Sequence, residues 1–177
     1  MSTAGEARPA ARLTVLTGPS GSGRRSVVEQ VRARFPLVWV PVPATTRPRC
    51  RHEVDGVDRL FLDPAGFDRL IAGDELLEWC RIGPYRRGVP RAGVRDRLAE
   101  GRPVLVPLDL PGALAVRATV PDPQLVLLAP PGYRPDPAVA AAFAHTVVHD
   151  RTERAAAELV GLLGSSFLAP AQPRPSG

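Results

Sequence analysis

The chain has 177 residues, a length typical of one domain, and its hydrophobic fraction of 44% fits a globular protein. All 23 basic residues are arginine, and the 18 acidic residues leave a net charge of +5. Because the arginines are scattered and not interleaved with aromatic residues, nucleic-acid binding is not expected. There is no apolar run of membrane-spanning length and no signal-peptide core near the N-terminus, and Cys50 and Cys80 lack metal-ligand spacing. These features predict a reduced, cytoplasmic setting without membrane contact.

Short apolar runs bounded by turn residues alternate with helix-type patterns along the chain. This alternation predicts an α/β fold with a parallel sheet flanked by helices. The expected strands are 13–17, 37–42, 103–108, 124–129 and 146–149, and the expected helices are 26–34, 91–100, 112–118 and 152–163. Residues 44–90 interrupt the alternation and predict an inserted subdomain with a small helix near 65–72. The segments 1–11 and 164–177 read as a disordered lead and a disordered Pro-rich tail around a domain at 12–163.

The run from Gly18 to Ser26, Gly-Pro-Ser-Gly-Ser-Gly-Arg-Arg-Ser, lies between the first expected strand and the first expected helix. Glycines there let backbone N–H groups turn toward phosphate oxygens at a helix N-terminus, as in a phosphate-binding P-loop. The predicted phosphate-binding residues are Gly18, Ser20, Gly21, Ser22, Gly23 and Ser26.

Two positions of this loop depart from the pattern G-x-x-x-x-G-K-[ST]. Arg24 stands where lysine is expected, and Arg25 stands where a hydroxyl residue is expected. A guanidinium is a wide planar fork, whereas an ammonium is a compact point charge, so the two are not interchangeable in a narrow loop. We therefore interpret Arg24 and Arg25 as degenerate catalytic positions.

A series of further motifs resembles, in order and spacing, the guanylate kinase family. They are Ala44-Thr-Thr-Arg-Pro-Arg49, Glu53-Val-Asp-Gly-Val-Asp58, Leu76-Leu-Glu-Trp79, Gly88-Val-Pro-Arg91, Leu108-Asp-Leu-Pro-Gly112 and Thr146-Val-Val-His-Asp150. The resemblance covers nearly all of residues 12–163. It implies a P-loop nucleoside-monophosphate-kinase fold, with an acceptor-binding subdomain at about 44–90 and a lid, and with ATP and Mg²⁺ as cofactors.

The resemblance also implies roles for individual residues. Arg47 matches the arginine that holds the GMP phosphate, and Glu78 and Asp109 match the carboxylates that accept hydrogen bonds from guanine. Without the family register, Glu78 fits a β-edge and Asp109 fits a helix cap at Gly112. Ser26 is the remaining hydroxyl near the expected magnesium position, with Ser22 as a second choice.

Other positions differ from the family pattern. Cys50 replaces a phosphate-binding arginine, Arg59 and Arg87 replace two tyrosines, and Pro107 replaces an acidic residue that supports Mg²⁺. The lid is truncated, and Arg134 is the one arginine left in it. A lost lid arginine is expected to cost orders of magnitude in rate.

Three functions compete on this basis. The departures favour a guanylate-kinase-like pseudoenzyme that keeps nucleotide-phosphate binding or binds an unknown protein partner. The intact glycines with Arg47, Glu78 and Asp109 favour the alternative, an active ATP-dependent GMP kinase. The arginines at 59 and 87 favour a further alternative, a kinase of another phosphorylated small molecule, because they make the acceptor pocket more cationic.

Overall fold

The computed structural model describes residues 11–165. The predicted disordered segments 1–11 and 164–177 lie almost entirely outside these residues. At the C-terminal end, the last helix, α6 (Thr152–Ser165), extends two residues past the predicted domain end at 163. No helix of the described part is long and apolar enough to cross a membrane.

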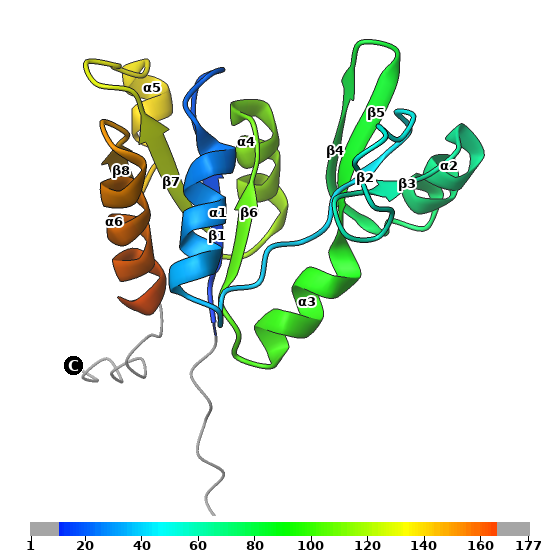
Figure 1. Cartoon of the computed structure of the whole chain (residues 1–177), viewed down its shortest axis with the longest axis horizontal. Coiled ribbons are helices and arrows are strands. Elements are labelled where there is room, and N and C mark those ends of the chain that lie inside the picture. Colours follow the sequence, from blue (N-terminus) through cyan, green and yellow to red (C-terminus); the bar gives the residue numbers. More distant parts are fainter. Residues whose placement is uncertain (1–10, 166–177) are drawn as a thin grey trace, which may run out of the picture.

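A parallel four-stranded sheet forms one half of the molecule (Figure 1). Its strands, in the order β6-β1-β7-β8, are β6 (Val104–Pro107), β1 (Leu13–Thr17), β7 (Gln124–Ala129) and β8 (His145–Val148). Every residue of the two central strands β1 and β7 is buried. Near-continuous apolar strands of this kind are expected where helices cover both faces of a sheet.

Alternate residues of β1 divide the core between the two faces of this sheet. Leu16 packs in a cluster with side chains of α1 (Arg24–Arg34) and α6, whereas Val15 packs in a cluster with α4 (Leu110–Thr119). Successive side chains of a strand point to opposite faces, so α1 and α6 cover one face and α4 covers the other. All strands of this sheet are parallel, so the loops after β1 and β6 lie at the same edge.

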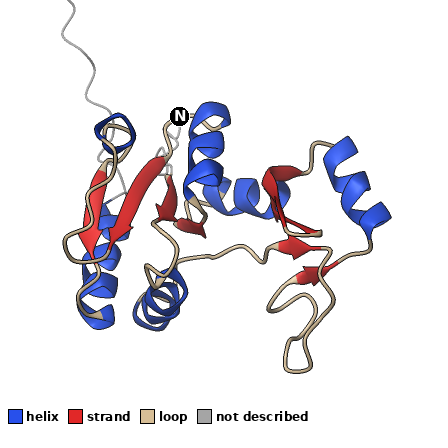
Figure 2. Ribbon diagram, turned by 90° about the horizontal axis from the view of Figure 1, so that it is seen from above, coloured by secondary structure: helices blue, strands red, loops and turns tan. Residues whose placement is uncertain are grey.

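A second, mixed sheet lies beside the first (Figure 2). Its strands, in the order β3-β2-β5-β4, are β3 (Leu60–Phe61), β2 (Ala44–Thr45), β5 (Tyr85–Pro90) and β4 (Leu76–Ile82). The small helix α2 (Pro64–Ala72) inserts the buried Phe67 into the cluster that covers this sheet. The helix α3 (Arg91–Ala99) leads from β5 back to β6. The four strands and α2 lie within the segment 44–90 that the sequence predicted as an insertion, and α3 coincides with the helix predicted at 91–100.

The strand predicted at 37–42 is wrong. The segment makes one isolated bridge, between Trp39 and Val104, and no regular strand. Pro41 and Pro43 lack backbone N–H donors, and this explains why the segment cannot continue a ladder.

Two helices begin two residues earlier than the sequence predicted. The first helix begins at Arg24 rather than Ser26, and the helix predicted from 112 begins at Leu110. Pro111 lies in the first turn of that helix, where the missing N–H of proline costs nothing.

The segment between β7 and β8 is short. It contains a single-turn helix, α5 (Pro137–Ala140), which Asp136 caps by accepting from the Ala138 N–H at 2.8 Å. Tyr133, Val139 and Phe143 of this segment line a small apolar cavity of about 60 Å³ beside Gly18 and Pro19. The segment therefore packs on the flank of the phosphate loop, and its Arg134 is exposed.

Candidate nucleotide-binding site

The loop between β1 and α1 has the geometry that phosphate binding needs. Gly21 and Gly23 adopt left-handed backbone angles, with φ of 77° and 80°. Gly23 is the N-cap of α1, and no side chain there accepts from the N–H groups of the first turn. These N–H groups therefore remain available to an anion, as the sequence predicted.

Gly18, Ser20, Ser22 and Ser26 take different places around this loop. Ser22 is 2% exposed and lines the main cleft, whereas Ser20 and Ser26 are exposed. Gly18 lies against the Leu128 carbonyl, where a Cβ would overlap that oxygen. Direct phosphate contacts of Ser20 and Ser26 stay predictions.

A histidine that the sequence did not single out supports the loop from β8. His149 Nδ1 lies 2.6 Å from the Ser22 carbonyl oxygen, and Nε2 lies 3.0 Å from the Thr152 hydroxyl. A carbonyl only accepts, so Nδ1–H donates to it and Nε2 accepts from Thr152. A Cβ at Gly23 would overlap the imidazole ring, so the ring lies directly against the loop backbone.

The two arginines of the loop point in different directions. Arg24 donates through Nη1 to the Leu108 carbonyl oxygen, just after the end of β6 in the same half of the molecule. Burial, reinforced by the nearby cation of Arg87, lowers the pKa of Arg24, and Asp109 partly offsets this. Arg25 is exposed and donates to Glu29 at 3.1 Å on the next turn of α1. Arg24 is therefore the loop cation that reaches the centre of the site.

On the opposite wall, Arg47 lies in an ion network with Glu53. Arg47 makes a two-pronged contact, with Nη1 and Nη2 at 3.0 and 2.7 Å from the two Glu53 oxygens. The Cys50 backbone N–H donates to Glu53 at 2.8 Å, and Arg59 Nε lies 3.7 Å from Glu53. The hydrogen bonds from Arg47, and after it from the Cys50 backbone N–H, lower the pKa of Glu53 to about 2. The carboxylate thus fixes the Arg47 guanidinium, which the sequence predicted as a phosphate ligand.

Glu78 and Asp109 lie together behind this wall. Glu78 is 9% exposed on β4, and its Oε2 is 3.1 Å from where a Cβ of Gly112 in α4 would lie. Asp109 is the N-cap of α4 and accepts from the Gly112 N–H at 2.9 Å. Burial, with a smaller contribution from Asp109, raises the pKa of Glu78 to about 7 against the opposing effect of Arg87. The cap interpretation of Asp109 is confirmed, and the cap uses one of its two carboxylate oxygens.

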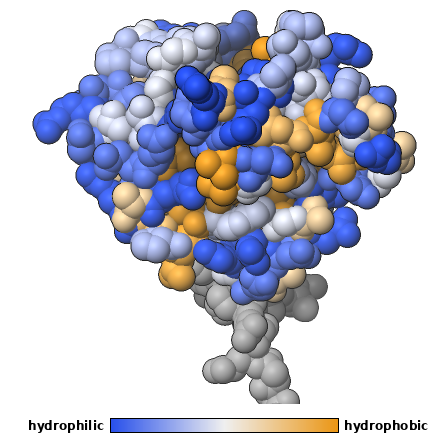
Figure 3. Space-filling view, turned by 45° about the vertical axis from the view of Figure 1, so that its right-hand side comes forward, coloured by the Kyte–Doolittle hydropathy of each residue, from blue (hydrophilic) through white to orange (hydrophobic). Residues whose placement is uncertain are grey.

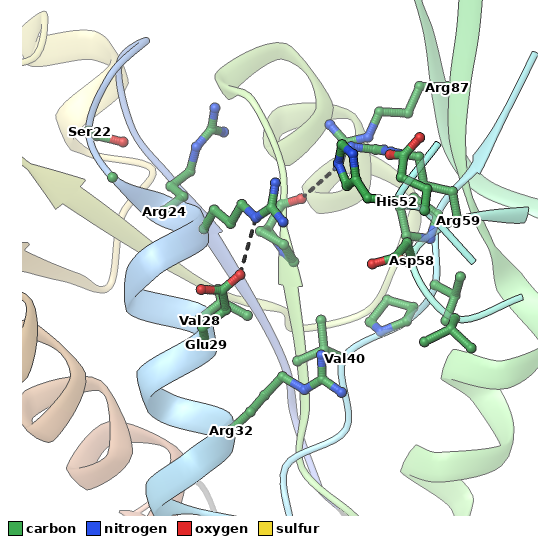
Figure 4. A pocket seen from close by; sticks show the side chains of 18 of the residues that line it. Ser22, Arg24, Val28, Glu29, Arg32, Val40, His52, Asp58, Arg59 and Arg87 are labelled. Atoms are coloured by element: carbon green, nitrogen blue, oxygen red, sulfur yellow. Dashed lines mark hydrogen bonds and ion pairs between the residues drawn. The ribbon is translucent and has the colours of Figure 1, made fainter. Parts of the chain in front are cut away.

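An open cleft of about 530 Å³ separates the phosphate loop from the second sheet. Figure 4 shows Ser22 and Arg24 on the α1 side, facing His52, Asp58, Arg59 and Arg87 on the other side. Among the predicted residues, Gly21, Ser22, Gly23, Arg24 and Arg25 line the cleft directly. The other predicted residues lie behind residues that line the cleft. Arg47 binds the lining residue Glu53, and Glu78 and Asp109 lie near the lining residue Arg87. The surface view in Figure 3 shows mostly hydrophilic residues, with apolar side chains gathered toward the middle of that face.

The described residues do not by themselves form a metal site. They hold no group of three histidine, cysteine, aspartate or glutamate residues that could bind a metal ion. Arg25 and Pro107 occupy the two positions where hydroxyl and carboxylate ligands were expected, and Mg²⁺ requires oxygen ligands. The Ser22 hydroxyl is buried without a partner, and Ser26 is exposed on α1. Ser26 stays a prediction as a weak magnesium ligand.

Comparison with known proteins agrees with this geometry. The sequence model of the guanylate kinase family matches residues 10–155. The chain belongs to the guanylate kinase family. It is 54% identical over 122 residues to the guanylate kinase of Thermobifida fusca, covering 69% of this chain and 62% of that protein. It is 49% identical over 128 residues to that of Streptomyces kasugaensis, covering 72% and 62%. The matched segments thus span about three fifths of these relatives.

A solved structure supports the fold independently. The guanylate kinase from Anaplasma phagocytophilum superposes with a TM-score of 0.73, covering 92% of this chain and 89% of that one. At 20% identity this likeness shows the fold alone, and it confirms the predicted α/β kinase-type architecture.

Sequence reasoning missed two features of the guanylate-kinase-type site. Glu53 and His149 both lie within motifs that resemble the family, but neither was assigned a role. Glu53 pairs with Arg47 across a loop, and His149 contacts a loop 127 positions earlier, so no spacing pattern indicated either contact.

Proposed function

We propose that this chain is an ATP-dependent guanylate kinase, a cytoplasmic enzyme that transfers the γ-phosphoryl group of ATP to the phosphate of GMP. The observation that carries the proposal is the buried Glu78 beside Asp109, next to Arg87 of the cleft that the phosphate loop lines. Two carboxylates offer only acceptors once ionised, and the Watson–Crick edge of guanine offers N–H donors to them. The names of the relatives favour this active alternative over the impaired enzyme that the sequence departures suggested.

In the proposed reaction, a phosphate oxygen of GMP attacks the γ-phosphorus of ATP. The new P–O bond forms GDP, and the bond to the β,γ-bridging oxygen breaks with its electron pair leaving on ADP. The protein contributes position and charge neutralisation, because phosphoryl transfer requires little covalent participation of side chains. Gly21, Gly23 and the start of α1 hold the ATP phosphates, and Arg47, fixed by Glu53, holds the GMP phosphate.

ATP and Mg²⁺ are the cofactors that we propose. Mg²⁺ supplies charge neutralisation on the ATP phosphates when it is bound, and it commonly keeps several water ligands in such sites. The chain offers it no carboxylate at Pro107 and no hydroxyl at Arg25, which leaves the Ser22 and Ser26 hydroxyls as the nearest protein oxygens of the loop. No observation in the described part of the chain favours the protein partner that the sequence left open.

Turnover with a panel of acceptors tests the proposal. The purified chain is incubated with ATP and Mg²⁺ together with GMP, AMP, CMP or UMP, and ADP and the diphosphate product are measured. We expect GDP to form with GMP at a rate at least about 100-fold above the other acceptors, because a buried hydrogen-bonding pocket discriminates strongly. Absence of GDP would return the chain to the impaired-enzyme interpretation. Equal rates with every acceptor would contradict the guanine pocket.

A further inference from the structure

Two arginines reach the same backbone segment from opposite walls of the cleft. Arg24, the first residue of α1, donates to the Leu108 carbonyl oxygen. Arg87, on β5, donates through Nη2 to the neighbouring Pro107 carbonyl oxygen at 3.3 Å. Figure 4 shows their side chains entering the cleft from the helix and from the second sheet. The end of β6 therefore holds one guanidinium from each half of the site.

Arginines outnumber carboxylates among the residues that line the cleft around this pair. The cation of Arg87 lowers the pKa values of both Arg24 and Arg59, in each case as the second cause after burial. Asp109 only partly offsets the lowered pKa of Arg24, and it also caps α4. Arg87 opposes the raised pKa of Glu78, and Glu53 binds Arg47. Converging, partly desolvated cations repel one another unless an anion lies between them.

Both arginines also keep donors free. A guanidinium carries five N–H bonds, and the carbonyl contacts of Arg24 and Arg87 each use one nitrogen. Arg87 Nε is buried and has no partner among the described residues, so only the Nη nitrogens of Arg87 are open to a ligand. Both residues line the open cleft between the phosphate loop and the acceptor wall. A phosphoryl group that passes from one wall to the other therefore passes between these two side chains.

We propose that Arg24 and Arg87 form a two-armed clamp on the phosphoryl group in transfer, so that Arg87 is a catalytic residue. The inference rests on the proposed kinase function. As the acceptor oxygen bonds to the γ-phosphorus and the bond to ADP breaks, charge spreads over the equatorial oxygens of the group. Each guanidinium donates to those oxygens while a backbone carbonyl holds it in place, that of Leu108 for Arg24 and that of Pro107 for Arg87. Little reorganisation is therefore needed. The short β7–β8 segment, with its exposed Arg134, is not required for this neutralisation.

The test uses the full chain, five variants and one bridged ligand. The variants Arg24→Gln, Arg87→Gln and their double mutant remove the charges, and Arg117→Gln, on the exposed surface of α4, is the matched control. Calorimetry measures the affinities for GMP, ADP and a molecule in which a polyphosphate chain joins adenosine to guanosine. Steady-state assays give kcat and KM for GMP, and circular dichroism verifies folding.

We expect Arg87→Gln to lower kcat and the affinity for the bridged ligand roughly 100-fold, the usual cost of losing one transition-state donor. Its affinities for GMP and ADP alone change by about threefold or less, as for a partly exposed charge. The double mutant is about as slow as either single mutant, because the two arms act as a unit. Arg87→Lys keeps the charge but loses the planar guanidinium, so its kcat and its affinity for the bridged ligand should lie between those of the wild type and Arg87→Gln.

Three results distinguish a failure of the clamp from a failure of the proposed kinase function. If Arg87→Gln matches Arg117→Gln in kcat and in bridged-ligand affinity, the clamp is refuted and the kinase stands. If Arg24→Gln is slow but Arg87→Gln is not, the phosphate loop acts alone and the clamp is again refuted. If the wild type neither forms GDP nor binds the bridged ligand, the proposed function itself fails.

Discussion

Glu78→Gln is expected to lower the affinity for GMP roughly 100-fold at pH 8, which corresponds to about 2.7 kcal/mol. The substitution keeps the shape of the side chain but turns one carboxylate oxygen into an N–H₂ donor. Because the side chain at position 78 is only 9% exposed, the new donor faces a donor of guanine and neither group is hydrogen-bonded. Calorimetric titration with GMP measures the loss.

The control for this variant is Glu75→Gln, which makes the same charge change at an exposed position just before β4. It should bind GMP as the wild type does. The wild type should also bind GMP more weakly as the pH falls below about 7, because the pKa of Glu78 is about 7 and the protonated carboxyl loses an acceptor. Above that pH its affinity levels off, and the glutamine variant shows no such step. An unchanged GMP affinity in Glu78→Gln would mean that guanine binds elsewhere.

Gly23→Ala is expected to destabilise the protein by about 3 kcal/mol or more and to abolish ATP binding. Two costs add at this position. The backbone angle φ of 80° is unfavourable for alanine by roughly 1–2 kcal/mol. The new methyl group also overlaps the His149 ring, which hydrogen bonds hold between Ser22 and Thr152. Urea unfolding and calorimetry with ATP measure the two effects.

Gly21→Ala separates these costs, because Gly21 has nearly the same φ, 77°, but nothing lies within 4 Å of its added Cβ. Only the backbone cost of about 1–2 kcal/mol should appear in its free energy of unfolding. The difference between the two variants then reports the contact with His149. Equal destabilisation by both substitutions would show that the ring does not pack against the loop.

The sequence predicted the fold and the phosphate loop well because their signals are local. Apolar strands such as 124–129 coincide with β7, and the glycine spacing placed Gly21 and Gly23 where left-handed angles occur. The strand at 37–42 failed because its apolar pattern concealed the effect of two prolines on hydrogen bonding.

The direction of long side chains could not be predicted in the same way. Arg24 and Arg25 are neighbours in sequence, but Arg24 reaches the Leu108 carbonyl oxygen at the end of β6, whereas Arg25 pairs with Glu29 on the helix surface. Burial of Glu78 likewise depends on α4 packing against β4, which brings residues 78 and 112 together. Such contacts follow from tertiary packing and leave no spacing pattern in the chain.

The central claim is that the cleft between the phosphate loop and the Glu78–Asp109 pair is a guanine-nucleotide site. Calorimetric titration of the wild-type chain at pH 8, with GMP and separately with AMP, tests it most directly. We expect saturable GMP binding and an affinity for AMP at least about 100-fold weaker, because the adenine edge presents an acceptor to the carboxylates. Equal affinities, or no binding of GMP, would contradict the account.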